Sequence, residues 1–172
     1  MAWRKMSLPI IHWHGFIDEV LRPENAEKEL AAFLFSEQPY TKSEQWHVLQ
    51  VKNIGLKGDT FGGWAPDRNH MQRLKAYAKR QKWTKLGNIH THPLSKKYAD
   101  AGYADDIDTA QTPSETDLKF AAKFNDIVRG IIVVDWYSEP PRIPIIHFHD
   151  KYGRTIFTMG SSPSSLVLSE RL

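Results

Sequence analysis

Residues 86–93 read Leu-Gly-Asn-Ile-His-Thr-His-Pro. This composition predicts a short strand that ends at Pro93, because proline lacks the N–H that a strand ladder needs. Residues two apart on a strand point to the same face, so the imidazoles of His90 and His92 can reach one metal ion. A His-x-His pair is weak evidence by itself, since such pairs are more often structural or exposed.

A second stretch, Pro-Ser-Glu-Thr-Asp-Leu at residues 113–118, predicts the start of a helix. Ser114 fits the N-cap, and Asp117, three residues on, completes a variant of the capping box. A carboxylate on that first turn can join the two imidazoles, and two histidines, one carboxylate and an open position form a catalytic zinc set. Ser-x-x-Asp alone is usually only a helix cap. The specific signal is its occurrence after a strand that ends in His-x-His-Pro.

The composition is that of one globular domain. The chain has 172 residues, of which 41% are hydrophobic and 25% charged, against roughly 150 residues per domain. Its formal net charge of +3 is modest and spread along the chain, whereas nucleic-acid footprints are usually stronger and clustered. The absence of cysteine excludes a disulfide framework, a cysteine nucleophile and a cysteine-ligated metal. We therefore expect a cytoplasmic protein that binds neither membrane nor nucleic acid.

The flanking sequence predicts alternating strands and helices. In the first half of the chain we expect a helical or helix-to-strand stretch over 16–36, a strand over 46–54 and a helix over 68–82 capped by Asp67. In the second half we expect a helix from Ser114 to about Asn125 and a strand over 127–136. A turn at Pro140, Pro141 and Pro144 then leads to a hairpin of 145–150 with 155–159. Within the first stretch, residues 30–35 fit either a helix end or a buried strand. This order predicts an α+β (mixed α/β) fold, with a central strand-rich sheet flanked by helices. One domain is expected over residues 1–160, followed by a Ser-rich tail, residues 161–172, that frays.

Two further His-x-His pairs are present, His12/His14 and His147/His149. Neither pair has a carboxylate nearby at a spacing that favours a metal. A partly exposed strand face is therefore the favoured interpretation for both, and a second metal stays open. The basic residues of the helix at 68–82 are interpreted as a solvated face, with docking of an acidic partner as the second interpretation.

The two motifs together resemble the JAMM signature of the MPN (JAB) domain metalloproteases, which is Glu, then His-Ser/Thr-His-Pro, then Ser-x-x-Asp. The form that begins at Pro113 is most similar to the prokaryotic JAB and RadC-type branches. The resemblance covers roughly residues 16–160 and implies an MPN/JAB-like domain of cytidine-deaminase-like architecture. It also implies zinc-dependent hydrolysis of peptide or isopeptide bonds, with deubiquitinase-like activity.

The resemblance implies that His90, His92 and Asp117 bind Zn²⁺ and that Ser114 hydrogen-bonds the developing oxyanion. The substrate it implies is a protein with an extended C-terminal tail, ubiquitin-like or sulfur-carrier-like. Such a tail would lie as an added strand beside a sheet edge. Two alternatives stay open, a non-catalytic MPN interaction or scaffold domain and a RadC-like DNA-associated protein.

The family's catalytic glutamate precedes a run of small and apolar residues. Glu29, followed by Leu-Ala-Ala-Phe-Leu-Phe, is the best match and is our choice for the general base. Glu27 and Glu37 are the alternatives. The small-residue positions after Glu29 hold alanine and serine in place of the family's glycine.

The linker between the two motifs departs from the family. Residues 94–113 separate Pro93 from Ser114, which is longer than the family's linker. The metal ligands tolerate such an insertion, because closure entropy grows slowly with loop length. Without periodicity and rich in aspartate, the segment is interpreted as a loop that forms a mobile flap beside the metal.

Overall fold

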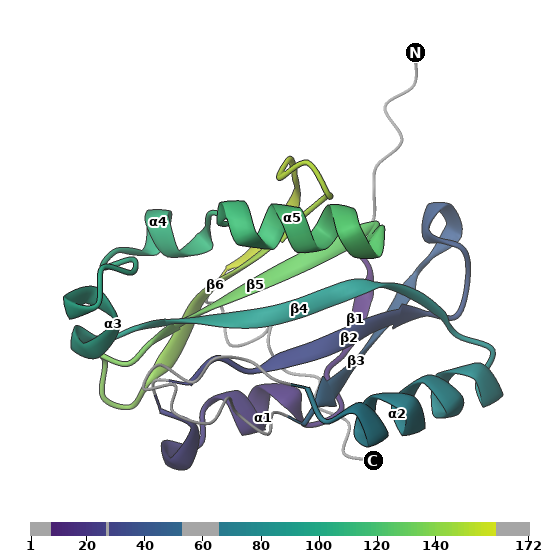
Figure 1. The fold of residues 1–172 in the computed structure, drawn as a ribbon, viewed down its shortest axis with the longest axis horizontal. Coiled ribbons are helices and arrows are strands. Elements are labelled where there is room, and N and C mark those ends of the chain that lie inside the picture. Colours follow the sequence, from purple (N-terminus) through teal and green to yellow (C-terminus); the bar gives the residue numbers. More distant parts are fainter. Residues whose placement is uncertain (1–7, 27, 53–65, 161–172) are drawn as a thin grey trace.

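The computed structural model describes residues 8–26, 28–52 and 66–160. Its centre is a seven-stranded sheet in the order β1-β3-β2-β4-β5-β6-β7 (Figure 1). The strands are β1 (Ile10–His12), β2 (Ala31–Ser36), β3 (Gln45–Val51), β4 (Thr84–Leu94), β5 (Val128–Asp135), β6 (Arg142–His149) and β7 (Thr155–Gly160). The β1–β3 and β4–β5 pairs are parallel and the other pairs are antiparallel.

Helices flank this sheet, and the mixed α/β prediction is confirmed. The α-helices are α1 (Phe16–Val20), α2 (Arg68–Arg80), α3 (Lys96–Asp100), α4 (Ile107–Gln111) and α5 (Glu115–Phe124), and the 3-10 turns are η1 (Pro23–Asn25) and η2 (Tyr40–Lys42). The longest helix of the described residues, α2, has 13 residues. None of the described helices combines the length and apolarity that a membrane crossing needs.

The strand register determines which side chains share a face of the sheet. Phe33 of β2 is paired with Asn88 of β4, which is paired with Arg129 of β5, so all three face the same side. On this side α2 packs over β2 and β3, and α4 packs over β4, β5 and β6. A groove lined by residues of α2 and α5 lies over β2 and β4 on this side.

The opposite face carries the larger core. Its members share near-complete burial and come from the N-terminal segment, α1 and the central strands; they include Trp13, Phe16, Leu34, Trp46, Ile89, Ile132, Ile146 and Phe148. The run at 30–35 is thus a buried strand and not a helix end: every residue of β2 is buried. Because β2 is paired on both edges and covered on both faces, it needs a continuous apolar run and shows no alternation.

Several predicted elements are confirmed. Asp67 caps α2 by accepting a hydrogen bond from the N–H of His70, at 3.1 Å. The basic side chains of that helix are solvent-exposed, as expected. The helix that begins after Ser114 ends at Phe124, one residue before the predicted end. The hairpin of β6 and β7 is also present. The predicted tail, residues 161–172, lies outside the described residues.

The prediction of a loop over 94–113 was wrong. The segment contains α3 and α4, which are capped by the side chains of Ser95 and Asp106. Tyr98 and Ala110 of these helices are buried against the rest of the protein. Helices of five residues complete little more than one turn, so they leave no periodic pattern in the sequence.

Two prolines lie inside strands, contrary to prediction. β4 continues through Pro93 to Leu94, because β5 still pairs with it there while β2 pairs no further than His90. The N–H of Thr91 donates to the backbone oxygen of Leu30, on the β2 side of β4. Because residues two apart on a strand direct their nitrogens to the same side, the nitrogen of Pro93 also faces that side, beyond the residues that pair with β2. Pro144 lies at an irregularity of the β5–β6 pairing within β6, where a missing donor is tolerated.

Candidate metal centre

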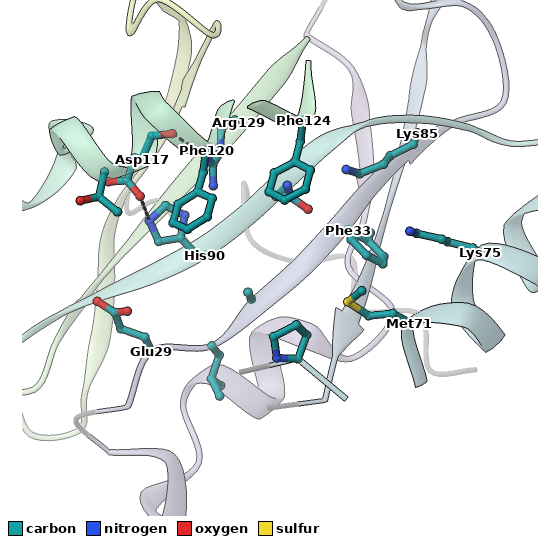
Figure 2. A pocket seen from close by; sticks show the side chains of 15 residues that line it. Glu29, Phe33, Met71, Lys75, Lys85, His90, Asp117, Phe120, Phe124 and Arg129 are labelled. Carbon is teal, nitrogen blue, oxygen red and sulfur yellow. Dashed lines mark hydrogen bonds and ion pairs between the residues drawn. The ribbon is translucent and has the colours of Figure 1, made fainter. Parts of the chain in front are cut away.

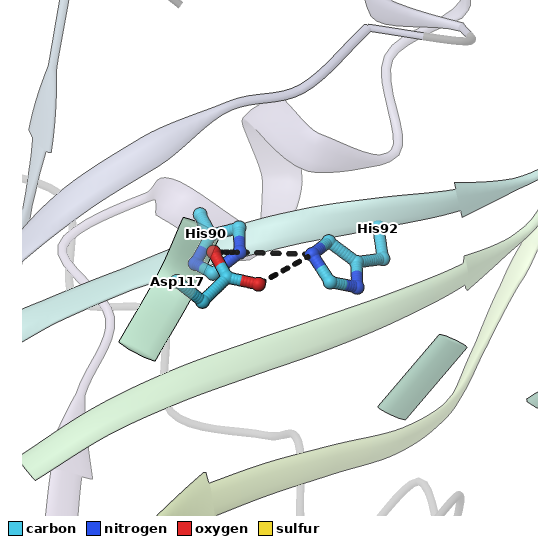
Figure 3. A group of neighbouring side chains, drawn as sticks. All are labelled: His90, His92 and Asp117. Atoms are coloured by element: carbon cyan, nitrogen blue, oxygen red, sulfur yellow. Dashed lines mark hydrogen bonds and ion pairs between the residues drawn. The ribbon is translucent and has the colours of Figure 1, made fainter. Parts of the chain in front are cut away.

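The two histidines and the aspartate predicted to share a metal lie together (Figure 3). The Nε2 atoms of His90 and His92 are 2.9 Å apart. Asp117 Oδ1 is 3.1 Å from His90 Nε2, and Oδ2 is 3.8 Å from His92 Nε2. One donor atom of each residue lies within 4.8 Å of the others, and no other set of three histidine or acidic residues in the described ranges does so. Two imidazole nitrogens and a carboxylate oxygen are a donor set that suits zinc.

Two elements bring these ligands together. β4 presents both histidines on the helix-covered face, since they are two residues apart. α5 places Asp117 on its first turn, above that face. Arg129 of β5, which is buried, donates from Nη1 to the backbone oxygen of Asp117 at 2.6 Å. This hydrogen bond anchors the first turn of α5 to the sheet at the position of the ligand.

Ser114 lies at the same corner of the site. Its Oγ–H donates to Asp117 Oδ2 at 2.7 Å, and its backbone N–H donates to the same oxygen at 2.8 Å. The N–H of Asp117 in turn donates to Ser114 Oγ at 3.1 Å, which completes the predicted capping box. The cap therefore both begins α5 and fixes the orientation of the carboxylate.

The segment 94–113 contributes a contact that the sequence did not reveal. His92 Nδ1 donates to the backbone oxygen of Ala110 in α4, at 2.6 Å. Donation from Nδ1 leaves the lone pair of Nε2 free to face Asp117 and His90. A hydrogen bond to the second ring nitrogen is what orients histidine ligands in metal sites. A backbone carbonyl has no side-chain identity, so no sequence motif could have indicated it.

The pKa values favour the protonation states that metal ligands need. Burial, then the neighbouring charge of His90, lowers the pKa of His92 to about 4. Burial by itself would raise the pKa of Asp117, but hydrogen bonding and charge from His90, with the Ser114 hydroxyl, hold it well below its usual range. At neutral pH the site therefore presents a neutral His92 and an ionised Asp117.

Glu29 lies beside this cluster, two residues before β2 begins at Ala31 (Figure 2). It is half-buried and lines both cavities that adjoin the metal ligands. Glu37 lies past the other end of β2, where its Oε1 is 3.0 Å from His47 Nε2. Glu27 is outside the described residues. The structure thus brings Glu29 to the centre and Glu37 away from it, while the catalytic role of Glu29 stays a prediction.

Two cavities meet at the centre. The first, of about 540 Å³, is the groove between α2 and α5. The second, of about 570 Å³, lies under the segment 94–113. Glu29, His90, Thr116 and Asp117 line both. A chain that enters one cavity and leaves by the other would pass the metal ligands.

The prediction that His147 and His149 lie on a partly exposed strand face was wrong. They are only 8% and 0% exposed. Pairing with β7 makes β6 an internal strand, and α4 covers it, so both side chains are enclosed on the face that carries the metal ligands. His149 Nδ1 donates to the backbone oxygen of Asp150 at 2.8 Å. Neither histidine belongs to a three-residue ligand cluster among the described residues.

The pair His12/His14 has a different setting. β1 and β3 pair in parallel with His12 beside His47, and His14 Nε2 is 3.0 Å from His47 Nδ1. The His47 ring also stacks on Trp83, with ring centroids 3.8 Å apart. These rings form a hydrogen-bonded aromatic stack that includes a contact with Glu37 and shares no residue with the candidate metal cluster.

No protein-family model and no curated protein matches this sequence. Among solved structures, the chain is similar to a JAB1/MPN domain protein from Archaeoglobus fulgidus, with 16% identity, a TM-score of 0.44, and coverage of 88% of this chain and 95% of that one. It is also similar to protein DSY2949 from Desulfitobacterium hafniense, with 16% identity, a TM-score of 0.47, and coverage of 84% and 86%. At this identity, the likenesses concern the fold and not the chemistry.

Proposed function

We propose that the protein is a zinc-dependent hydrolase of peptide or isopeptide bonds, of the MPN/JAB type. The observation that carries the proposal is the convergence of His90, His92 and Asp117 where two cavities meet. Three protein ligands and an open position are typical of catalytic zinc, whereas structural zinc is closed by four. His90 and His92 of β4 and Asp117 of α5 would thus hold the zinc.

Each residue of the site has a distinct task. Zinc, when bound, polarises the scissile carbonyl and lowers the pKa of a water molecule in the open position. Glu29 takes the proton of that water and passes it to the leaving amine. Ser114 turns its Oγ–H from Asp117 Oδ2 toward the substrate carbonyl and donates to that oxygen as it becomes negative.

The substrate we propose is an extended protein tail of the ubiquitin-like or sulfur-carrier-like kind. The cavities on both sides of the metal ligands accept a chain that continues in both directions. Beyond His90 the described part of β2 pairs no further, and there β4 would offer carbonyl oxygens to an added strand, since the N–H of Thr91 already donates to Leu30 and Pro93 has none. Added strands bind through such edges by main-chain hydrogen bonds. We propose a cytoplasmic location for the reaction, with no nucleic acid or membrane taking part.

Zinc content per chain tests the proposal first. Elemental analysis of purified protein should give about one zinc in the wild type and clearly less in His92→Ala. Gly-Gly-tailed fusion proteins should then be cleaved by the wild type and not by Glu29→Gln, which should keep its zinc. Wild-type protein that takes up no zinc on reconstitution would overturn the proposal, as would a Glu29→Gln variant as active as the wild type.

A further inference from the structure

The groove between α2 and α5 runs from the metal ligands toward two lysines (Figure 2). Glu29, His90 and Asp117 lie at one end of it, and Lys75 and Lys85 at the other. Between them stand three phenylalanine rings, from Phe33, Phe120 and Phe124. A groove of about 540 Å³ is within the usual size for a ligand pocket.

Two of the three rings are exposed to solvent. Phe120 and Phe124 are one helical turn apart on α5 and are 46% and 54% exposed. Their rings are parallel within 7°, with centroids 6.1 Å apart. Phe33 forms the buried floor between them and α2. Exposed aromatic side chains grouped along a concave surface are typical of binding sites.

The far end of the groove carries one uncompensated positive charge. Lys85 Nζ is 3.2 Å from the carboxylate of Asp126, so its charge is paired. Lys75 Nζ lies 5.7 Å from the centre of the Phe33 ring, and none of the described carboxylates forms an ion pair with it. A ligand that fills the aromatic part and ends in a carboxylate would complement both features.

We infer that this groove is a specificity subsite for a polypeptide segment of the substrate that carries an aromatic side chain and, farther from the cleaved bond, an acidic one. The inference rests on the proposed function for the position of that bond. The aromatic side chain packs among Phe33, Phe120 and Phe124, and the acidic side chain pairs with Lys75.

Element geometry sets the spacing. Phe120 and Phe124 follow Asp117 by three and seven residues on α5, which is about 5 and 10 Å along the helix axis. The end of the groove that holds Lys75 also holds Lys85, which precedes His90 by five residues on β4 and so marks a distance of about 17 Å along the strand. An extended chain advances about 3.3 Å per residue. The aromatic residue is therefore expected about three residues from the cleaved bond, and the acidic residue about five.

Binding of short peptides tests this subsite without relying on cleavage. The probes are fluorescein-labelled Gly/Ser dodecapeptides with one Phe and, two residues away, one Asp, made in both chain directions. Their dissociation constants for zinc-loaded wild-type protein are measured by fluorescence anisotropy. Replacing the peptide's Phe by Ala should weaken binding about tenfold, and replacing its Asp by Lys about threefold.

Charge reversal gives the decisive comparison. Lys75→Glu should bind the Lys-containing peptide better than the Asp-containing one. Lys79→Glu, one turn farther along α2 and outside the lining of the groove, should keep the wild-type preference. Phe124→Ala should lose the preference for Phe, and Tyr137→Ala, an exposed aromatic elsewhere, should not. Equal preferences in Lys75→Glu and Lys79→Glu would overturn the inference, as would no binding by any probe.

Mass spectrometry of the same mixtures separates this inference from the proposed function. Binding that depends on Phe, Asp and Lys75 without peptide cleavage supports the subsite and contradicts the hydrolase. Cleavage that requires zinc and Glu29, with the same rate for all peptides, supports the hydrolase and overturns the subsite.

Discussion

His92 in β4 donates from Nδ1 to the backbone oxygen of Ala110 in α4, across 2.6 Å. The long insertion between the two motifs therefore helps to orient a candidate metal ligand. α4 in turn begins at Asp106, whose side chain caps it by accepting from the N–H of Thr109 at 2.8 Å. The Asp106 cap therefore stabilises α4, α4 positions the carbonyl of Ala110, and that carbonyl orients the imidazole of His92.

Removing the cap should therefore weaken zinc binding at a distance. Asp106→Ala is expected to lower the free energy of unfolding, since α4 loses its cap, and to weaken zinc affinity by about tenfold. Competition with a chromogenic chelator measures the affinity. Asp67→Ala removes the equivalent cap of α2 and is the matched control, with a similar cost in stability and unchanged zinc affinity. Equal zinc affinities in the two variants would contradict the proposed dependence.

Arg129 should be required for both stability and metal binding. Its side chain is buried and donates to the backbone oxygen of Asp117. Arg129 Nε lies 3.8 Å from Asp126 Oδ2. Arg129→Met is expected to destabilise the metal-free protein by about 3 kcal/mol, because a buried carboxylate and carbonyl lose a charged partner. Urea denaturation measures this cost. Arg154→Met breaks an exposed pair with Asp150 and should cost less than about 1 kcal/mol.

The metal-free protein should become more stable between about pH 4 and 6.5. The folded-state pKa of His92 is about 4, below its ordinary value of 6.5, so in this window the unfolded chain binds the proton and the folded one does not. Stability rises with pH there, by roughly 3 kcal/mol. Urea midpoints of chelator-treated protein across the window measure the slope. His92→Gln should reduce the slope and leave the part due to His147 and His149, whose pKa values burial also lowers. A slope unchanged in His92→Gln would refute the assignment.

Gly87 should tolerate no side chain. A Cβ at this position would lie 1.9 Å from the backbone oxygen of Val128, where β4 and β5 begin to pair. Gly87→Ala is expected to destabilise the protein by more than about 3 kcal/mol, because the backbone of β4 or of β5 must move to make room for the added methyl group. Gly160→Ala, which has open space around its Cβ, is the control. Equal changes in the unfolding temperatures of the two variants would show that the close approach of Gly87 to Val128 is not required.

The residues of the candidate centre could be identified from the chain because they depend on local rules. Alternation along a strand puts His90 and His92 on one face, and a capping box fixes Asp117 on the first turn of a helix. The apolar strand β5, the cap of α2 and the β6–β7 hairpin follow from equally local patterns. In each case, the signal and the structure it predicts involve residues close together in the sequence.

Other features depend on contacts between distant segments and could be decided only by the folded structure. The burial of His147 follows from β7 and α4 covering β6. Glu29 lies near the candidate centre and Glu37 away from it because the Ala31 end of β2, and not the Ser36 end, pairs with His90. α4 orients His92 through a main-chain carbonyl. A five-residue helix and a backbone oxygen leave no pattern in the sequence. Strand order and register, which involve residues far apart in the chain, assemble the groove from α2, β2, β4 and α5.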